Sequence, residues 1–161
     1  MKILAINRRA NFDYEILEKY EAGLVLFGHE VKSVKTGHIN LEGSFLVIRS
    51  IGNNKLPEFF LINAYIPLYK QAAGVKNYNP ERPRKALLKK NEISHLLGKK
   101  KEQGLTLVPL KIYTKRSFIK LEFGIGRGKK KIDKRETIKK REIQRQVRTL
   151  TKRQNSAYSA N

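Results

Sequence analysis

The stretch LTLVPLKIYTKRSFIKLEFGIG, residues 105–126, decides the fold class. Apolar side chains such as Leu110, Ile112, Leu121 and Phe123 alternate roughly with polar ones in both halves. Alternation of this kind is typical of strands that bury one face. The two halves therefore predict a β-hairpin and, with it, an antiparallel sheet.

Further strands are expected upstream, in the second half of residues 12–27 and over residues 44–50 and 56–68. In the first of them, Gly23 indicates a bulge or a close backbone approach. Residues 69–85 are polar, basic and proline-bearing, which predicts a loop.

Two short helices are expected between these strands. Residues 28–37 carry Val31 and Val34 three apart, with a glycine at each end. Residues 90–104 carry an apolar face, and Asn91 is the expected N-cap. Five or six short strands with two or three helices predict a mainly β, α+β fold. A small closed antiparallel barrel of the oligonucleotide-binding (OB) type would hide the edges of such a sheet.

A basic segment follows the last expected strand. Residues 126–153 contain thirteen lysines and arginines against three acids, a net charge of +10. Such a segment repels itself and has few apolar residues to bury. We therefore expect a folded domain over residues 1–126 and a basic tail over residues 127–161. The tail is expected to be disordered until something negative orders it.

The net charge of the 161 residues, +21, bounds the partner. Nucleic acid and an anionic membrane surface both attract such a field. Beyond Gly126 the aliphatic residues form at most a thin helical stripe, whereas a membrane-surface helix needs a broad apolar face. Nucleic acid is therefore favoured over membrane.

The absence of cysteine removes disulfides, thiolate catalysis and cysteine-ligated zinc. The apolar run at residues 3–6 is too short for the core of a signal peptide. These two observations predict a soluble, cytoplasmic protein.

Several short segments match part of a known metal-binding or phosphate-binding motif but lack an essential residue or spacing. His29 and Glu30 start like the zinc motif HExxH, but Ser33 stands where the second histidine belongs. His38 and His95 are far apart and lack partner patterning, so no metal is expected. The segment GIGRGK has neither P-loop nor dinucleotide spacing, and a flexible exit from the last strand is expected there.

Catalysis is not expected either. A metal-dependent nuclease holds its ions with clustered carboxylates. Here Asp13 and Asp133 are the only aspartates, and the glutamates are mostly interleaved with lysines. No cofactor is predicted, and an RNA-cleaving enzyme is the least favoured alternative.

Basic clusters recur among tyrosines along the chain, for example Arg8-Arg9, residues 82–85 and residues 99–101. Lysine and arginine bind phosphates and release counterions, and exposed aromatic rings stack on unpaired bases. This combination favours RNA as the partner.

Two sequence blocks narrow this interpretation to a particular kind of RNA-binding protein. One is EAGL with GHEVKS, within residues 21–33, and the other is GKKKIDKR, residues 128–135. With NRR at residues 7–9 and RKALL at residues 84–88, they resemble the SsrA-binding protein (SmpB) family in the family's order. The resemblance runs from about Ile3 to Glu142.

The resemblance implies an RNA-binding adaptor with an OB-like barrel. Its partners would be the tRNA-like domain of transfer-messenger RNA and the stalled 70S ribosome, including 16S rRNA. The body would grip the RNA near its elbow and D-loop. The tail would become helical, from Thr137 onward, inside the empty mRNA channel. A monomer without cofactor or membrane is expected; the alternative is a general ribosome-associated RNA-binding protein.

Specific residues follow from the same resemblance. The implied RNA-binding residues of the body are Asn7, Arg8, Tyr14, Glu21, Lys32, Arg84, Lys85 and Leu87. Tyr14 and Leu87 have a second interpretation as core residues. The implied tail residues at the decoding site are Arg127, Gly128, Lys129, Lys130, Lys131, Ile132, Asp133, Lys134 and Arg135. Ile132 replaces the aromatic or histidine that is common in the family, so packing would replace ring stacking there.

Overall fold

A computed structural model describes residues 1–50, 56–72, 74–100 and 104–130, together with positions 132, 133, 142, 143, 147 and 151. The chain divides into two compact units, Met1–Gly128 and Lys129–Asn161. Within the described part, the first unit holds seven strands and three helices. In chain order they are β1 (Lys2–Ile6), α1 (Ala10–Asp13), β2 (Tyr14–Leu24), α2 (Gly28–Lys35), β3 (Phe45–Arg49), β4 (Glu58–Ile62), β5 (Arg84–Leu87), α3 (Lys90–Lys100), β6 (Leu105–Lys115) and β7 (Phe118–Gly128).

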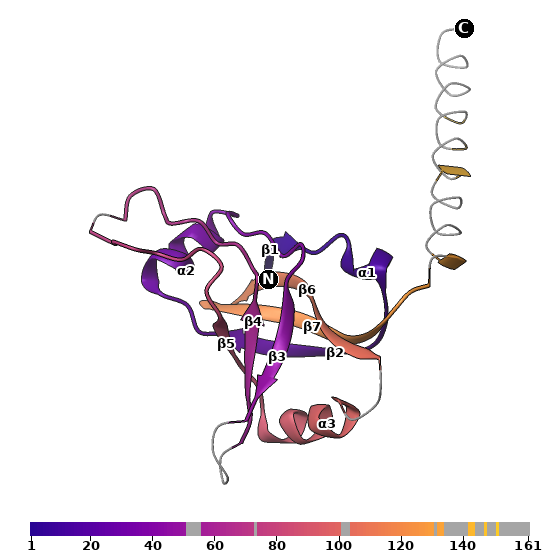
Figure 1. The fold of residues 1–161 in the computed structure, drawn as a ribbon. Coiled ribbons are helices and arrows are strands. Elements are labelled where there is room, and N and C mark those ends of the chain that lie inside the picture. Colours follow the sequence, from indigo (N-terminus) through magenta and orange to yellow (C-terminus); the bar gives the residue numbers. More distant parts are fainter. Residues whose placement is uncertain are drawn as a thin grey trace, which may run out of the picture. The chain divides into compact units, whose positions relative to one another are not determined.

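Six strands are hydrogen-bonded in a closed circuit, the strand ring. β6 pairs with β3, β3 with β4, β4 with β5, β5 with β2, β2 with β7, and β7 again with β6. Every pairing is antiparallel, and β1 joins the ring on β6. In Figure 1, β3 and β4 run across β2, β6 and β7. The expected β-rich α+β class with antiparallel pairing is confirmed.

The main core lies on the inner face of the ring. It takes apolar side chains from every strand of the ring and from α2 and α3, including Phe59, Leu61, Ile112, Leu121 and Phe123. The predicted hairpin of residues 105–126 is confirmed as β6 and β7, whose turn has Arg116 at φ 56°. Alternation along β7 buries Ile119 and Leu121 and turns their neighbours outward.

A bulge at Leu17 changes which side of β2 faces the core. Ile16 pairs with Gly126 and Glu18 with Ile125, so the residue between them is extra. The extra residue reverses the alternation. Tyr20 and Ala22 therefore contact the main core, whereas Tyr14 and Ile16 pack in a second cluster on the outer face, under α1. Of the two alternatives predicted for Gly23, a bulge or a close backbone approach, the bulge was wrong, because Gly23 is paired in register with both β5 and β7.

The three glycines of GIGRGK belong to β7, and two of them, Gly124 and Gly126, make room for this outer cluster. A Cβ on Gly124 would lie 2.6 Å from Cγ2 of Ile16 and 2.9 Å from the carbonyl oxygen of Glu18. A Cβ on Gly126 would lie 3.0 Å from Cδ1 of Ile16. The expected flexible exit was therefore wrong. Gly124 and Gly126 are paired strand residues that leave room for the Ile16 side chain of β2, and β7 continues to Gly128.

The remaining expectations differ in detail. The helices α2 and α3 and the strands β3 and β4 lie in their predicted segments, although β4 is shorter than residues 56–68. The strand β5 begins inside the predicted loop of residues 69–85, and β1 and α1 were not predicted. Asn91 lies within α3, so its predicted role as N-cap was wrong. Glu92 accepts a hydrogen bond from the backbone nitrogen of Lys89 (2.8 Å) instead.

In the second unit, the described positions beyond residue 130 are helical. The backbone nitrogen of Lys130 donates to the Asp133 carboxylate (3.1 Å), a contact typical of a helix start. Helical structure is therefore present before Thr137. The helix predicted from Thr137 onward belongs to the tail inside the mRNA channel and stays a prediction. Ile132, Ile143 and Val147 are more than half exposed. Disorder of this segment in the free protein stays a prediction.

Candidate nucleic-acid interface

Four of the eight predicted RNA-binding residues of the body lie on the outside of the ring: Tyr14, Glu21, Lys85 and Leu87. We use the name outer patch for eight outward-facing residues at one end of β2 and the strands beside it. They are Glu21, Gly23, Lys85, Leu87, Tyr113, Lys115, Phe118 and Lys120. Their chain neighbours Ala22, Ala86, Ile112, Ile119 and Leu121 are buried in the main core. Strand alternation therefore turns the patch residues to the outer face.

Glu21 is the charged centre of the outer patch. The Tyr113 hydroxyl donates a hydrogen bond to its carboxylate, and Lys115 Nζ donates to it at 3.1 Å. Lys120 Nζ lies 3.6 Å from the other carboxylate oxygen. The bond from Tyr113, followed by the two lysines, lowers the pKa of Glu21 even though partial burial opposes this. Burial and then Glu21 raise the pKa of Tyr113 to about 12, so the hydroxyl keeps its proton.

Lys85 and Leu87 flank this centre on β5. Lys85 Nζ forms an ion pair with Glu58 and keeps 40% of its side chain exposed. Leu87 is paired with Gly23 and is 53% exposed. The interpretation of Leu87 as a core residue was therefore wrong.

Asn7, Arg8 and Tyr14 lie at the opposite end of β2. Tyr14 and Gly23 are nine positions apart on β2, which at about 3.3 Å per residue is about 30 Å. The predicted RNA-binding residues therefore form two groups rather than one. Tyr14 packs against the outer cluster of Ala10, Val108 and Leu110. Its side chain is only half-buried, so part of it is also exposed to solvent.

The side chain of Asn7 is occupied by the protein backbone. Its amide donates to the carbonyl oxygens of Leu41 (3.3 Å) and Pro109 (3.0 Å), and its oxygen accepts from the nitrogen of Ala10 (3.2 Å). Only 7% of Asn7 is exposed. Asn7 therefore shapes the turn into α1, while its neighbour Arg8 is exposed.

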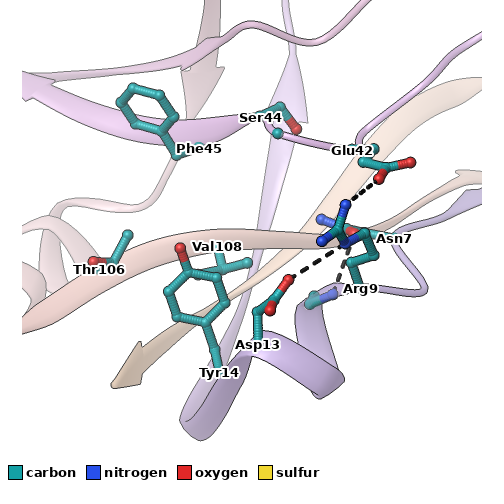
Figure 2. A pocket seen from close by; sticks show the side chains of 11 residues that line it. Asn7, Arg9, Asp13, Tyr14, Glu42, Ser44, Phe45, Thr106 and Val108 are labelled. Carbon is teal, nitrogen blue, oxygen red and sulfur yellow. Dashed lines mark hydrogen bonds and ion pairs between the residues drawn. The ribbon is translucent and has the colours of Figure 1, made fainter. Parts of the chain in front are cut away.

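A pocket of about 490 Å³ opens at this end of β2. Tyr14, Phe45 and Val108 form its walls, as Figure 2 shows. The Arg9 guanidinium lies at one side, 2.7 Å from Glu42 and 3.5 Å from Asp13. Aromatic walls beside a held guanidinium suit a planar ring.

Arg84 cannot contact phosphate in this structure, contrary to the prediction. It is 0% exposed, and its Nε donates to Glu30 (2.9 Å). Its other nitrogens donate to the carbonyl oxygens of Ala64, Arg82 and Pro80 and to the Tyr78 hydroxyl. The guanidinium is thus a buried cross-link between β5 and the chain that precedes it.

Glu30 of α2 is the counterion of this cross-link. Arg82 donates to Glu30 from Nε (3.0 Å) and Nη2 (2.5 Å) while its guanidinium lies 3.9 Å from the ring centroid of Phe27. Burial alone would raise the pKa of Glu30. The bonds from Arg82 and the Phe27 nitrogen and the charge of Arg84 outweigh burial and lower it. α2 is thereby fixed to the segment before β5.

Lys32, also on α2, is exposed, and its Nζ lies 5.9 Å from the ring centroid of Tyr69. Arg127 and Gly128 are the last, exposed residues of β7 and pair with Glu15 and Tyr14. The predicted tail residues Lys131, Lys134 and Arg135 lie outside the described residues.

Two of the three histidines, His38 and His95, have polar side-chain partners. His95 Nε2 lies 3.0 Å from Glu18, and His38 Nδ1 lies 2.8 Å from the Thr36 hydroxyl. Across the described ranges, no group of three or more histidine, aspartate or glutamate side chains could hold a metal ion. None of the helices in those ranges is long and apolar enough to cross a membrane.

Five of the eight outer-patch residues were not among the predicted RNA-binding residues. One is Gly23, and the other four are Tyr113, Lys115, Phe118 and Lys120 on β6 and β7. The alternation of β6 and β7 was the signal that could have found them. Once Ile119 and Leu121 are assigned to the core, the residues between and before them must face outward.

A basic, β-rich α+β domain with lysines and the exposed ring of Phe118 on its outer face belongs to the class of small nucleic-acid-binding proteins. The sequence matches the SmpB protein family over residues 4–153, and the chain belongs to that family.

Named relatives agree with this assignment. The chain is 50% identical to the SsrA-binding protein of Thermosipho melanesiensis, over 94% of this chain and 99% of that protein. It is 51% identical to the SsrA-binding protein of Anoxybacillus flavithermus, over 91% and 90%. A solved structure described as "tmRNA-SmpB: a journey to the center of the bacterial ribosome" contains a chain that is 44% identical, with a TM-score of 0.61. That similarity covers 83% of this chain and 93% of the other.

Proposed function

We propose that this protein binds transfer-messenger RNA (SsrA RNA) through its tRNA-like domain and delivers it to stalled ribosomes, where the nascent chain is tagged for degradation. The observation that carries the proposal is the match to SsrA-binding proteins at about half identity over nearly the whole chain. The outer patch and the pocket beside Tyr14 are the surfaces that take the RNA.

The protein acts as a non-enzymatic, monomeric adaptor in the cytoplasm, where ribosomes are. The strand ring is a closed barrel of the OB type, and it presents both RNA-binding surfaces on its outside. The first unit selects the RNA. The basic second unit, disordered in the free protein, enters the empty mRNA channel and the decoding site and folds there, because phosphates supply its countercharge.

Recovery of bound RNA tests the first part of the proposal. The full chain is isolated from cells and its RNA is sequenced, and purified complexes are then challenged with an excess of bulk tRNA. We expect transfer-messenger RNA to be enriched and to resist displacement. RNA recovered in proportion to its abundance, and displaced readily, supports the alternative of a general RNA-binding protein.

Truncation after Gly128 tests the division of labour, because it keeps β7 whole. Affinity for transfer-messenger RNA should stay near that of the full chain, while tagging of nascent chains on stalled ribosomes should be lost. Circular dichroism of the truncated chain controls for loss of the fold. Tagging by the truncated chain contradicts the role of the second unit.

A further inference from the structure

Two large apolar side chains of the outer patch face water on β5 and β7, the strands on either side of Gly23 in β2. Leu87 is 53% exposed and Phe118 is 69% exposed. Gly23 pairs with Leu87 on one side and with Lys120 on the other, so the three strands β5, β2 and β7 meet here. A hollow of about 280 Å³ is lined by Gly23, Leu24, Leu87, Phe118, Ile119 and Lys120.

Gly23 keeps the floor of this hollow low. A Cβ at this position would lie 3.7 Å from Cβ of Leu87, an ordinary contact, and the backbone of Gly23 has no positive φ. Packing and conformation therefore do not require a glycine here. A larger side chain would be accommodated by the fold and would fill the hollow.

The fold makes no use of the Phe118 ring. Core packing takes the next residue, Ile119, which is 6% exposed, while Phe118 begins β7 on the outer face. A single exposed apolar residue needs no explanation. Two of them beside a bare glycine form a surface that can receive a flat apolar ring.

Cationic groups surround this apolar surface. Lys120 lines the hollow itself, and Glu21 holds it together with Lys115. Lys85 lies on the neighbouring strand, next to Leu87 in the chain. A nucleotide has the complementary composition, because its base is a flat ring and its phosphate is an anion. An apolar peptide would match the ring surface but not the lysines.

We propose that Phe118 and Leu87 clamp an unstacked nucleobase of the bound RNA over Gly23, and that Lys120 binds the phosphate of the same nucleotide. This inference rests on the proposed RNA-binding function and deepens it. The family resemblance implies a contact for Leu87 alone. The ring of Phe118 and the floor at Gly23 are new.

A single tryptophan tests the clamp directly, because the chain contains no tryptophan. Phe118→Trp places one fluorophore in the clamp, and Ile6→Trp places one on β1 at a position that is 58% exposed. A transcript of the tRNA-like domain of transfer-messenger RNA is titrated into each full-length variant. We expect the fluorescence of the Phe118→Trp variant to be quenched on binding and that of the Ile6→Trp variant to stay nearly constant.

Affinity measurements complete the test. Base stacking on an aromatic ring corresponds to about 5- to 150-fold in affinity, so Phe118→Ala should raise Kd by a factor in this range. The dependence of log K on log salt should keep its slope, because no charge is lost. Gly23→Val should also weaken binding by filling the hollow. Ile6→Ala, the matched control, should bind as the wild type does.

The possible failures are distinct. Wild-type affinity in both Phe118→Ala and Gly23→Val overturns the clamp and leaves the proposed function standing, provided that the wild type selects transfer-messenger RNA. Wild-type RNA affinity together with Phe118-dependent binding of a protein, or self-association in sedimentation, assigns the surface to another partner and also overturns the clamp. Loss of RNA selectivity in the wild type overturns the proposed function itself. Unchanged thermal midpoints for these exposed positions exclude misfolding as the cause.

Discussion

The Tyr113 hydroxyl of β6 donates a hydrogen bond to the Glu21 carboxylate of β2, across the intervening strand β7. Lys115 and Lys120 approach the same carboxylate. Since protein donors occupy Glu21 so fully, we expect this residue to act on RNA through the lysines that it positions rather than by reading a base or a sugar hydroxyl.

The hydroxyl of Tyr113 should set the acidity of Glu21. Tyr113→Phe removes the largest influence that lowers the pKa of Glu21, so this pKa should rise toward its ordinary value. Carboxyl-detected NMR titration of both glutamates measures the change. Tyr20→Phe is the matched control, because Tyr20 is the first cause that lowers the pKa of Glu18 to about 2. That variant should raise the pKa of Glu18 and leave Glu21 unchanged; a shift at Glu21 in both variants contradicts the assignment.

The lysines of the outer patch should contribute to the salt dependence of RNA binding. Each phosphate contact adds about 0.7–0.9 to the slope of log K against log salt. Lys85→Gln and Lys120→Gln should each reduce the slope by about that amount and weaken binding. Lys90→Gln on α3, an exposed lysine away from the outer patch, is the control. Filter binding at salt concentrations between about 50 and 200 mM measures the slope for all three variants. Equal slopes in all variants would mean that the patch does not touch phosphate.

The buried Glu30 should be essential for the stability of the first unit. Glu30→Gln leaves the guanidinium of Arg84 buried without its countercharge, which should lower the free energy of unfolding by about 3 kcal/mol or more. Glu42→Gln, which breaks the exposed pair with Arg9, should change stability little. Urea denaturation measures both, and similar losses in the two variants contradict the role of Glu30.

The stability of the first unit should also depend on pH through Glu30. The pKa of Glu30 is lower in the folded protein than in the unfolded chain, where it is about 4.3. Its contribution to stability is therefore complete above the unfolded value and is lost as pH falls through the folded value. Urea denaturation from neutral pH to about pH 3 should show a loss in the wild type that is smaller in Glu30→Gln. Parallel curves for the two proteins would contradict this linkage.

The sequence predicts local features of this fold better than long-range ones. Alternation in residues 105–126 is enough to predict the hairpin and the burial of Leu121, because both depend on near neighbours. The charge run at residues 82–85 suggests a solvated surface. Arg84 is buried because Glu30, 54 residues away, neutralises it, and no local pattern shows this. The phosphate contact predicted for Arg84 failed for this reason, whereas Lys85, its neighbour, faces outward as alternation requires.

The role of Gly124 likewise depends on a residue that is far away in the sequence. The segment GIGRGK is typical of a loop, yet Gly124 is required because Ile16, 108 positions earlier, lies on it. Gly124→Ala would place a methyl group 2.6 Å from the Ile16 side chain and 2.9 Å from the backbone oxygen of Glu18, so the two strands must move apart. We expect a loss of about 1–3 kcal/mol in the free energy of unfolding.

A double-mutant cycle separates the two contacts of that methyl group. Ile16→Ala removes the side-chain contact but leaves the backbone contact with Glu18. Gly124→Ala should therefore cost less in the Ile16→Ala background than in the wild type, yet still cost something. Gly128→Ala is the control, because a Cβ there has nothing within 4 Å. Equal costs for Gly124→Ala in both backgrounds would mean that Ile16 does not dictate the glycine. The backbone oxygen of Glu18 on β2 would then be the only one of these two contacts that requires a glycine at position 124.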